Sequence, residues 1–275
     1  MAFSVNVNEP ALLALRALTN TNNDLSTTQE RISTGLEIGS ARDNAAIFSI
    51  AQQLRGDVRG LNAVRQSLDR GISTIDVALA ASTAISDLLL ELKERAVAAA
   101  DAGLDQTSRD ALSTDFVTLR DQISQIVANA EFNGSNLIDA GTDQIVAITN
   151  ADATQTLNIA HENLTLGGGV IDIGPAQDID TQAEAAAAVT DINNSIDQLN
   201  EVLTRFGAGA TALEQSRTFN EQLQDVVEVG IGNLVDADLA QESANLQALQ
   251  VRQQLGLQSL SIANQAPQAI LSLFQ

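Results

Sequence analysis

The sequence predicts a mainly α-helical protein, an elongated helical hairpin with coiled-coil packing, a small β-hairpin insert and paired N- and C-terminal helices. Leucine and isoleucine recur every seven residues over long stretches, the spacing that keeps one apolar stripe against a partner helix. Aromatic residues make up only 3% of the 275 residues, whereas hydrophobic residues make up 44%. Such a composition suits helices packed side by side better than a compact core filled by large rings.

The first helix is predicted over residues 9–34, because Leu18, Leu25 and Ile32 lie seven residues apart. Gly35 and Gly39 then interrupt the pattern and predict a hinge.

The second helix is expected to start at Ser40, which forms a capping-box pattern with Asp43. It should run to about Gly103. Its seam is marked by a further series of heptad positions, Leu54, Leu61, Leu68 and Ile75. Thr107, with Asp110 three residues later, predicts the start of a third helix that stops near the turn dipeptide Asn133-Gly134.

Residues 142–173 change character and predict two to four small strands in hairpins. The candidate strands are the short β-branched segments Gln144–Ile148, Thr156–Ala160 and Val170–Ile173.

A fourth helix is predicted after the capping-box pair Thr181 and Glu184. Gly207 and Gly209 are expected to weaken it in the middle, and Gly230 and Gly232 predict a second hinge. A final helix follows, and Pro267 is expected to interrupt it before an apolar tail.

The order of these elements is roughly palindromic, so a hairpin that brings both termini together is the simplest arrangement. It divides into three parts: terminal helices (1–39 and 233–275), a helical rod (40–141 and 179–232) and a β-rich insert (142–178).

The terminal helices are poor in charge, since the first 23 residues contain only Glu9 and Arg16 and the last 33 only Arg252. Each would expose an apolar stripe that a lone helix pair cannot bury, so we expect it to pack against other chains. The expected assembly residues are Leu15, Leu18, Leu25, Ile32, Leu36, Leu246, Leu249, Leu257, Leu260, Leu271 and Phe274.

The net charge of −21, from 14 basic and 35 acidic residues, excludes nucleic acid and anionic membrane surfaces as expected partners. Most of the excess lies between Arg120 and Arg205, which enclose thirteen acidic and no basic residues. There is no cysteine, no signal-peptide pattern and no apolar run near the ~18 residues of a spanning helix. We therefore expect a cytosolic protein, or one exported without a cleaved signal.

Three motifs that suggest chemistry have simpler explanations. His161-Glu162 opens like a zinc-protease motif, but the chain has only one histidine and the motif needs two. Asp236, Asp238 and Glu242 are expected to form a charged helix start, and residues 167–169 a glycine turn. We therefore expect no catalytic residue, metal or cofactor.

Four separated motifs resemble the signatures of bacterial flagellins. They are R-I-S-T-G-L-E-I-G-S-A-R-D-N-A-A (31–46), E-F-N-G-S-N-L-I (131–138), N-L-V-D-A-D-L-A-Q-E-S (233–243) and A-N-Q-A-P-Q-A-I-L (263–271). They occur in the order of the family and cover both arms of the hairpin, whereas residues 142–178 carry no match.

The resemblance implies a structural subunit of the flagellar filament, exported unfolded through the flagellar type III apparatus. Its implied partners are further copies of itself, sibling flagellins, an export chaperone, and cap and hook-associated proteins. The terminal helices would form the inner tube and the rod the outer wall. A hook–filament junction protein, which shares the terminal pattern, is the alternative. A signalling helical hairpin would need a membrane span or a basic tip, and the chain has neither.

The resemblance also places an innate-immune recognition region at Leu90–Arg95. Receptors that bind some flagellins use a basic residue there, whereas this chain has Glu91 at the matching position, with Arg95 nearby. Weak or absent recognition is therefore expected.

Overall fold

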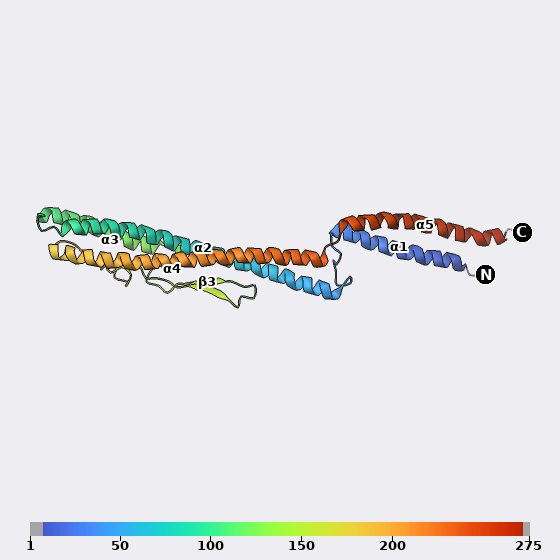
Figure 1. Cartoon of the computed structure of the whole chain (residues 1–275), viewed down its shortest axis with the longest axis horizontal. Helices are drawn as coiled ribbons and strands as arrows, with labels where there is room; N and C mark the ends of the chain where they lie inside the picture. Colours follow the sequence, from blue (N-terminus) through green and yellow to red (C-terminus); the bar gives the residue numbers. More distant parts are fainter. Residues whose placement is uncertain (1–7, 272–275) are drawn as a thin grey trace. The chain divides into compact units, whose positions relative to one another are not determined.

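The computed structural model describes the backbone of residues 8–271 and the side chains of residues 8–265. The described chain is mainly helical, as the heptads predict, with two small antiparallel strand pairs. It divides into two compact units (Figure 1). The first comprises residues up to Gly56 and from Val226 onward, and the second comprises Asp57–Asp225. The helices are α1 (Glu9–Thr34), α2 (Ala45–Ala99), α3 (Gln106–Asn129), α4 (Gln182–Val235) and α5 (Leu239–Leu271).

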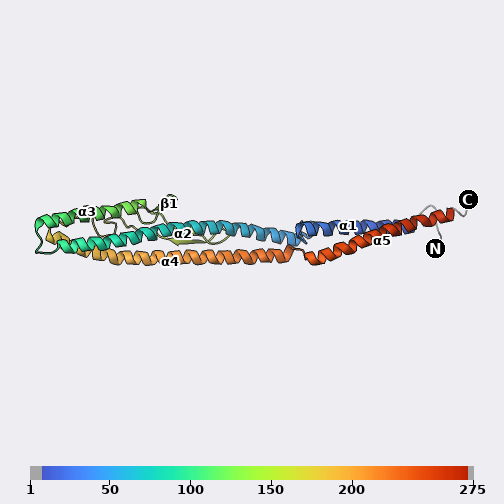
Figure 2. The same ribbon diagram turned by 90° about the horizontal axis from the view of Figure 1, so that it is seen from above.

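The second unit is built from α3 and the adjoining lengths of α2 and α4, which lie side by side (Figure 2). Antiparallel α2 and α4 meet where the buried Asn220 amide donates to the Leu61 carbonyl at 2.9 Å. One apolar core runs through the unit. Its largest fully buried side chains include Phe116, Phe206, Leu68, Ile75, Ile85, Leu89, Leu92 and Ile123.

Two hairpins pack against these helices. Strands β1 (Glu131–Phe132) and β2 (Ser135–Asn136) form the first, and β3 (Ile145–Ile148) and β4 (Thr156–Ile159) form the second. Ile145, Ala147 and Ile159 of the second hairpin join the helical core. Segment 142–178 therefore belongs to the second compact unit instead of forming a part of its own.

Buried serines from three helices hold the non-helical segment in place. Ser67 of α2 accepts the Ile148 N–H at 3.1 Å, and Ser195 of α4 accepts the Asp172 N–H at 2.9 Å. Ser113 of α3 accepts the Ile179 N–H at 3.4 Å. These hydroxyls pair backbone groups that would otherwise be buried without a partner.

Two predicted helix starts are wrong by a few residues, because neighbouring side chains make the caps. Helix α2 begins after Asn44, whose side chain accepts the Ala46 and Ile47 N–H groups at 3.1 and 3.2 Å. The carboxylate of Asp43 instead accepts the Ser40 N–H at 2.9 Å and closes a turn, and these bonds lower its pKa. The third helix is capped by Asp105, not Thr107.

The capping box at the start of α4 is confirmed. The Thr181 N–H donates to the Glu184 carboxylate at 3.0 Å, and the Glu184 N–H donates to the Thr181 hydroxyl at 3.2 Å.

The non-helical predictions are partly confirmed. Asn133 and Gly134, with φ of 52° and 83°, form the turn between β1 and β2, a hairpin that the sequence reading missed. Strands β3 and β4 lie where two strands are predicted, but Val170–Ile173 contains only an isolated bridge from Ile171 to Leu166.

The glycines of α4 and the proline of α5 do not break their helices. Helix α4 continues through Gly207 and Gly209, and then through Gly230 and Gly232 to Val235. The predicted second hinge is therefore wrong, and the chain leaves the helix at residues 236–238. Buried Ile231 and Val235 supply packing that offsets the glycine cost of about 1 kcal/mol each. Helix α5 likewise continues past Pro267 to Leu271.

Candidate assembly surface

Helices α1 and α5 of the first unit pack against each other and run antiparallel (Figure 1). Three polar contacts mark the pairing along its length. The Asn8 side-chain amide donates to the Ala263 carbonyl at 2.9 Å, and the Gln253 amide donates to the Asn22 side chain at 2.8 Å. At the other end the Arg31 guanidinium donates to the Glu242 carboxylate at 3.0 Å.

The seam between the two helices follows a heptad spacing on both sides. Its less exposed positions on α1 are Ala11, Ala14, Leu18, Thr21, Leu25, Thr28 and Ile32. Those on α5 are Glu242, Leu246, Leu249, Gln253, Gly256, Leu260 and Ala263. Leu18 packs where Gly256 has no side chain, since a Cβ there would lie 3.3 Å from the Leu18 Cδ1. Because many of these side chains are small or polar, the seam buries little apolar surface.

Most of the predicted assembly residues lie in this seam, within one chain. Leu18, Leu25, Ile32, Leu246 and Leu260 are half-buried, and Leu249 is buried.

The other predicted assembly residues lie in different surroundings. Leu15 and Leu257 are 48% and 54% exposed. Half-buried Leu36 bridges to Asp236. Leu271 ends α5 and its side chain is not described, whereas Phe274 lies outside the described residues.

A second apolar stripe on α5 faces away from the seam. Val251, Leu255 and Ile262 are 55%, 56% and 62% exposed and recur at intervals of four and seven residues. Leu12 and Leu13 of α1 are exposed as well. The sequence reading missed this stripe because it assigned apolar heptads directly to contacts between chains. A search of α5 for two separate heptad series of apolar residues, on opposite sides of the helix, would have found this stripe.

The breaks after α1 and α4 are joined to each other by backbone hydrogen bonds. The Glu37 N–H donates to the Val235 carbonyl at 2.7 Å, and the Ala237 N–H donates to the Gly35 carbonyl at 2.9 Å. Gly35, with φ of 73°, caps α1 in the left-handed conformation that glycine adopts without strain. Gly39 lies in the turn closed by Asp43. Backbone hydrogen bonds therefore hold the two breaks together as one joint within the first unit.

Acidic residues flank this joint at the start of α5. The Asp238 carboxylate accepts the Ala240 and Gln241 N–H groups at 2.9 and 3.1 Å, so it caps the helix as the sequence predicts. The Glu242 side chain is only 11% exposed and pairs with Arg31.

The region predicted to have diverged from immune recognition lies on α2. Glu91 is exposed, and Arg95 is half-buried. The Arg95 guanidinium lies 3.4 Å from the Glu94 carboxylate and 3.9 Å from that of Asp115, so its charge is partly neutralised.

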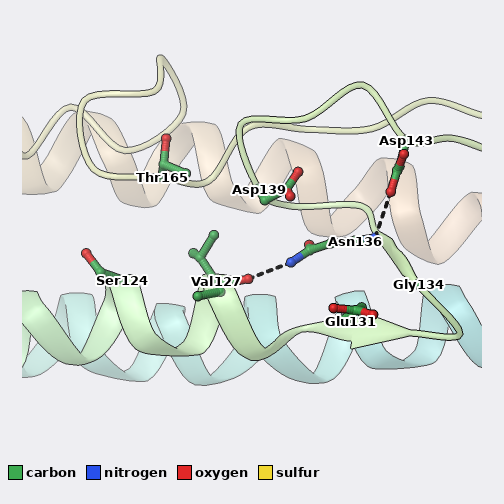
Figure 3. A pocket seen from close by; sticks show the side chains of 9 residues that line it. Ser124, Val127, Glu131, Gly134, Asn136, Asp139, Asp143 and Thr165 are labelled. Atoms are coloured by element: carbon green, nitrogen blue, oxygen red, sulfur yellow. Dashed lines mark hydrogen bonds between the residues drawn. The ribbon is translucent and has the colours of Figure 1, made fainter.

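A hollow of about 410 Å³ lies between the end of α3 and the loop after β2 (Figure 3). Carboxylates of Glu131, Asp139 and Asp143 line it, and the buried Asn136 amide donates to the Val127 carbonyl at 2.7 Å. Its lining residues include no base paired with a nucleophile.

The structure places the histidine and the glycines that suggested chemistry in the sequence within the packed loop after β4. His161 is half-buried instead of exposed, and its Nε2 has no hydrogen-bond partner. Residues 167–169 form a glycine turn, in which the Gly167 N–H donates to the Ile171 carbonyl at 2.9 Å. In the described part of the chain, no three His, Asp or Glu side chains form a group able to hold a metal. No helix within residues 8–271 is long and apolar enough to span a bilayer.

Comparison with protein families gives two matches that together cover most of the chain. The model described as the bacterial flagellin N-terminal helical region matches residues 5–143. The model of the bacterial flagellin C-terminal helical region matches residues 189–274. Residues 144–188, which include the hairpin of β3 and β4, lie between the two matches.

Curated proteins similar over the full length include flagellin FljM of Caulobacter vibrioides, which is 45% identical over 272 residues. The alignment covers 99% of this chain and 98% of that protein. A flagellin of Brucella melitensis is 34% identical over 281 residues, covering 99% of each chain.

Solved structures share the fold. A Bacillus cereus flagellin aligns with a TM-score of 0.51 and 21% identity, covering 56% of this chain and 88% of the other. A putative flagellar hook-associated protein from Vibrio parahaemolyticus aligns with a TM-score of 0.58 and 13% identity, covering 70% and 100%. At these identities the likeness concerns the fold alone.

Proposed function

Since the chain belongs to the bacterial flagellin family, we propose that it polymerises through the apolar faces of α1 and α5 that its own helix pair leaves uncovered. It is a structural subunit of the flagellar filament, the polymer that serves swimming motility. The family points to a structural protein and not to an enzyme.

The exposed stripe of Val251, Leu255 and Ile262 is the observation that carries this proposal. Seam residues hold α5 against α1, so a second apolar stripe on the opposite side has no partner within the described pair. Only Arg252 is charged among residues 243–275, so few charges solvate this surface. An apolar surface of this kind gains free energy when another chain covers it.

Assembly and ordering of the terminal helices are coupled in this proposal. A two-helix pair whose seam contains Thr28, Gln253 and Gly256 gains little from its own packing. Most helical stability in proteins comes from tertiary contacts, so burial against neighbouring subunits stabilises α1 and α5 further.

The charge distribution suggests how the subunit is oriented in the filament. Charge-poor terminal helices suit the inner wall, where charges would be close together and poorly hydrated. The stretch between Arg120 and Arg205, with its thirteen acidic residues, suits the outside, where water and salt screen it. A filament structure with residues 142–178 at the axis would contradict this orientation.

The same proposal gives the chain an export route, a final location outside the cell and a set of protein partners. The subunit is exported through the flagellar type III apparatus and resides in the extracellular filament. An export chaperone covers the apolar stripes before assembly, and cap and hook-associated proteins contact the polymer at its ends. Sibling flagellins can share the filament, because their terminal helices would present matching stripes.

Substitution of Leu255 by Glu tests the proposed interface. Leu255 is exposed in the pair, so L255E should leave monomer helicity and thermal stability unchanged and abolish filament formation in sedimentation assays. The exposed neighbour Gln254 provides the control, since Q254E adds the same charge outside the stripe and should polymerise. Normal filaments from L255E would overturn the proposal.

Deletion of residues 246–275 tests the role of the whole terminal segment. The truncated chain should remain soluble, with a folded second unit visible by circular dichroism, and should not sediment as filaments. Polymerisation of the truncated chain would show that residues 246–275 are dispensable for assembly.

Hook–filament junction activity is not favoured. Both family models that match describe flagellin, and the hook-associated protein shares only the fold at 13% identity.

Exposed Glu91 also supports the proposal that immune receptors recognise this flagellin weakly. Strong receptor activation by purified monomer would contradict it, and E91R provides the variant in which recognition should rise.

A further inference from the structure

Arginines with no ion pair line an exposed face of α2 in the second unit. Arg59 and Arg70 are exposed and eleven residues apart, which places them on the same side of the helix three turns apart. Arg65 between them is exposed too, but it lies about 120° around the helix from that face. None of the three lies within 4.0 Å of a carboxylate among the side chains that the structure describes. The side of α2 that carries Arg59 and Arg70 therefore presents two positive charges that no carboxylate of the described residues neutralises.

The second unit has two unlike ends, because α2 and α4 run antiparallel. Asn220 meets Leu61, and Gly209 lies beside Ile75, so residues 57–78 and 204–225 share one end. The Gln106 side chain donates to the Asp180 carbonyl at 2.9 Å, so residues 79–130 and 172–203 share the other.

Charge differs sharply between these two ends. The end with the free arginines has six acidic and five basic residues, whereas the other has fifteen acidic and four basic. The bases of the acidic end are largely occupied: Arg120 pairs with Asp121 at 2.8 Å, and buried Arg109 donates to the carbonyls of Asp101 and Leu104. The acidic end therefore retains a large excess of negative charge.

From this asymmetry we propose a second, electrostatic contact between subunits, in which the Arg59–Arg70 face of one copy docks on the acidic end of another. The proposal rests on the proposed function, because the contact is one between neighbouring subunits of the polymer. In a helical polymer the contacts are heterologous, so unlike patches of identical chains face each other. Charge complementarity of this kind fixes the register of docking and speeds association.

Two arginine substitutions test the contact against a charge-matched control. The variant R59Q/R70Q and the control Q52E/Q53E each lower the net charge by two at exposed helical positions, and the control lies outside both ends of the second unit. At about 0.05 M salt the critical concentration for polymerisation should rise at least about threefold in R59Q/R70Q relative to the control. At about 0.5 M salt the difference should disappear, because the screening length is then shorter.

Equal critical concentrations for the two variants at low salt would overturn the proposed contact. This outcome differs from failure of the terminal interface, because L255E is expected to block polymerisation at every salt concentration.

Cross-linking locates the partner surface directly. The chain has no cysteine, and exposed Gln66 lies on the same side of α2 as Arg59 and Arg70, so Q66C carries a single attachment point for a photo-activated cross-linker. Filaments mixed from isotope-labelled and unlabelled Q66C should give cross-links between chains, with the second site in residues 79–130 or 172–203. Cross-links confined to one chain, or to other segments of a second chain, would overturn the assignment.

Discussion

Gly60 of α2 is required for close packing, whereas Gly207 of α4 is not. A Cβ at Gly60 would lie 2.9 Å from the Ala151 Cβ and 3.0 Å from the Ala151 carbonyl oxygen, so the loop after β3 rests directly on the helix. A Cβ at Gly207 would meet nothing within 4 Å. The same residue type therefore has opposite consequences at the two positions.

Alanine substitutions should separate these two glycines. G60A should destabilise the second unit by about 1–3 kcal/mol, because the contact is with backbone that must shift. G207A should stabilise it by about 0.5–1 kcal/mol, through helix propensity and a less flexible unfolded chain. Urea unfolding followed by circular dichroism measures both. A stabilising G60A would show that the loop moves away at no cost.

The cap formed by Asp105 makes the stability of the start of α3 depend on pH. Its carboxylate accepts the Ser108 hydroxyl at 2.7 Å and the Ser108 N–H at 3.2 Å, and these bonds lower its pKa. A lowered folded-state pKa contributes stability that is present at neutral pH and is lost as pH falls through that pKa.

The wild-type chain should therefore melt at a higher temperature than D105N at pH 7, and the gap should close in acid. Thermal unfolding of both proteins across the acid range measures the gap. D152N changes an exposed aspartate in a loop and should show no comparable pH-dependent gap. A constant difference for D105N at all pH values would contradict the role of its ionised carboxylate.

At the scale of elements, heptad spacing identifies the helices but not all of their ends. Leu18, Leu25 and Ile32 locate α1, and the box of Thr181 and Glu184 locates the start of α4. Two other caps were misplaced because several acceptors stood close together and local sequence does not choose between them.

The glycines and the assembly surface were harder to predict for a different reason. Whether Gly230 breaks α4 depends on how well Ile231 is buried by distant residues, which local sequence does not reveal. Likewise, Leu249 and Leu255 are chemically alike, and only the position of α1 decides which of them is buried within the chain. Heptad spacing therefore predicts where apolar stripes lie on a helix, but not whether a helix of the same chain or another chain covers them.

Asn8 explains why Pro267 is compatible with α5. Proline has no N–H, so the carbonyl of Ala263, four residues earlier, loses its helical donor. The Asn8 amide nitrogen donates to that carbonyl at 2.9 Å, while its side-chain oxygen accepts the Ala11 N–H at 3.1 Å and caps α1. One side chain therefore satisfies backbone groups of both helices.

A double-mutant cycle tests this coupling. N8S keeps a capping oxygen but loses the amide donor, and should weaken the α1–α5 pair by about 1 kcal/mol. In a P267A background the helix supplies its own N–H, so N8S should have a much smaller effect. The filament melting temperature measures all four proteins. Additive effects of the two substitutions would exclude the coupling.

At the scale of the whole molecule, the two units differ in how much core they possess. The buried cluster of the second unit includes Phe116, Phe206 and Leu213, together with residues of both hairpins. Among the side chains that the structure describes in the α1–α5 pair, there is a single seam, and Leu249 is its largest buried side chain. Local opening should therefore be more frequent in the terminal pair.

Limited proteolysis of monomer and filament should reveal this difference. A broad-specificity protease should remove α1 and α5 from the monomer first and leave a resistant fragment that contains residues 57–225. In filaments the same helices should be protected, because neighbours bury them. Mass spectrometry identifies the fragments, and equal protection of α1 and α5 in monomer and filament would contradict coupling between ordering and assembly.

The pairing of α1 with α5 also governs when the assembly surface comes into existence. Asn8 and Ala263 are 255 positions apart, so α1 emerges from the ribosome long before its partner helix has been synthesised. Closing such a long loop carries an entropic penalty that the intervening second unit, once folded, reduces. The chain consequently cannot present both stripes in register during translation, which separates its synthesis in time from its polymerisation.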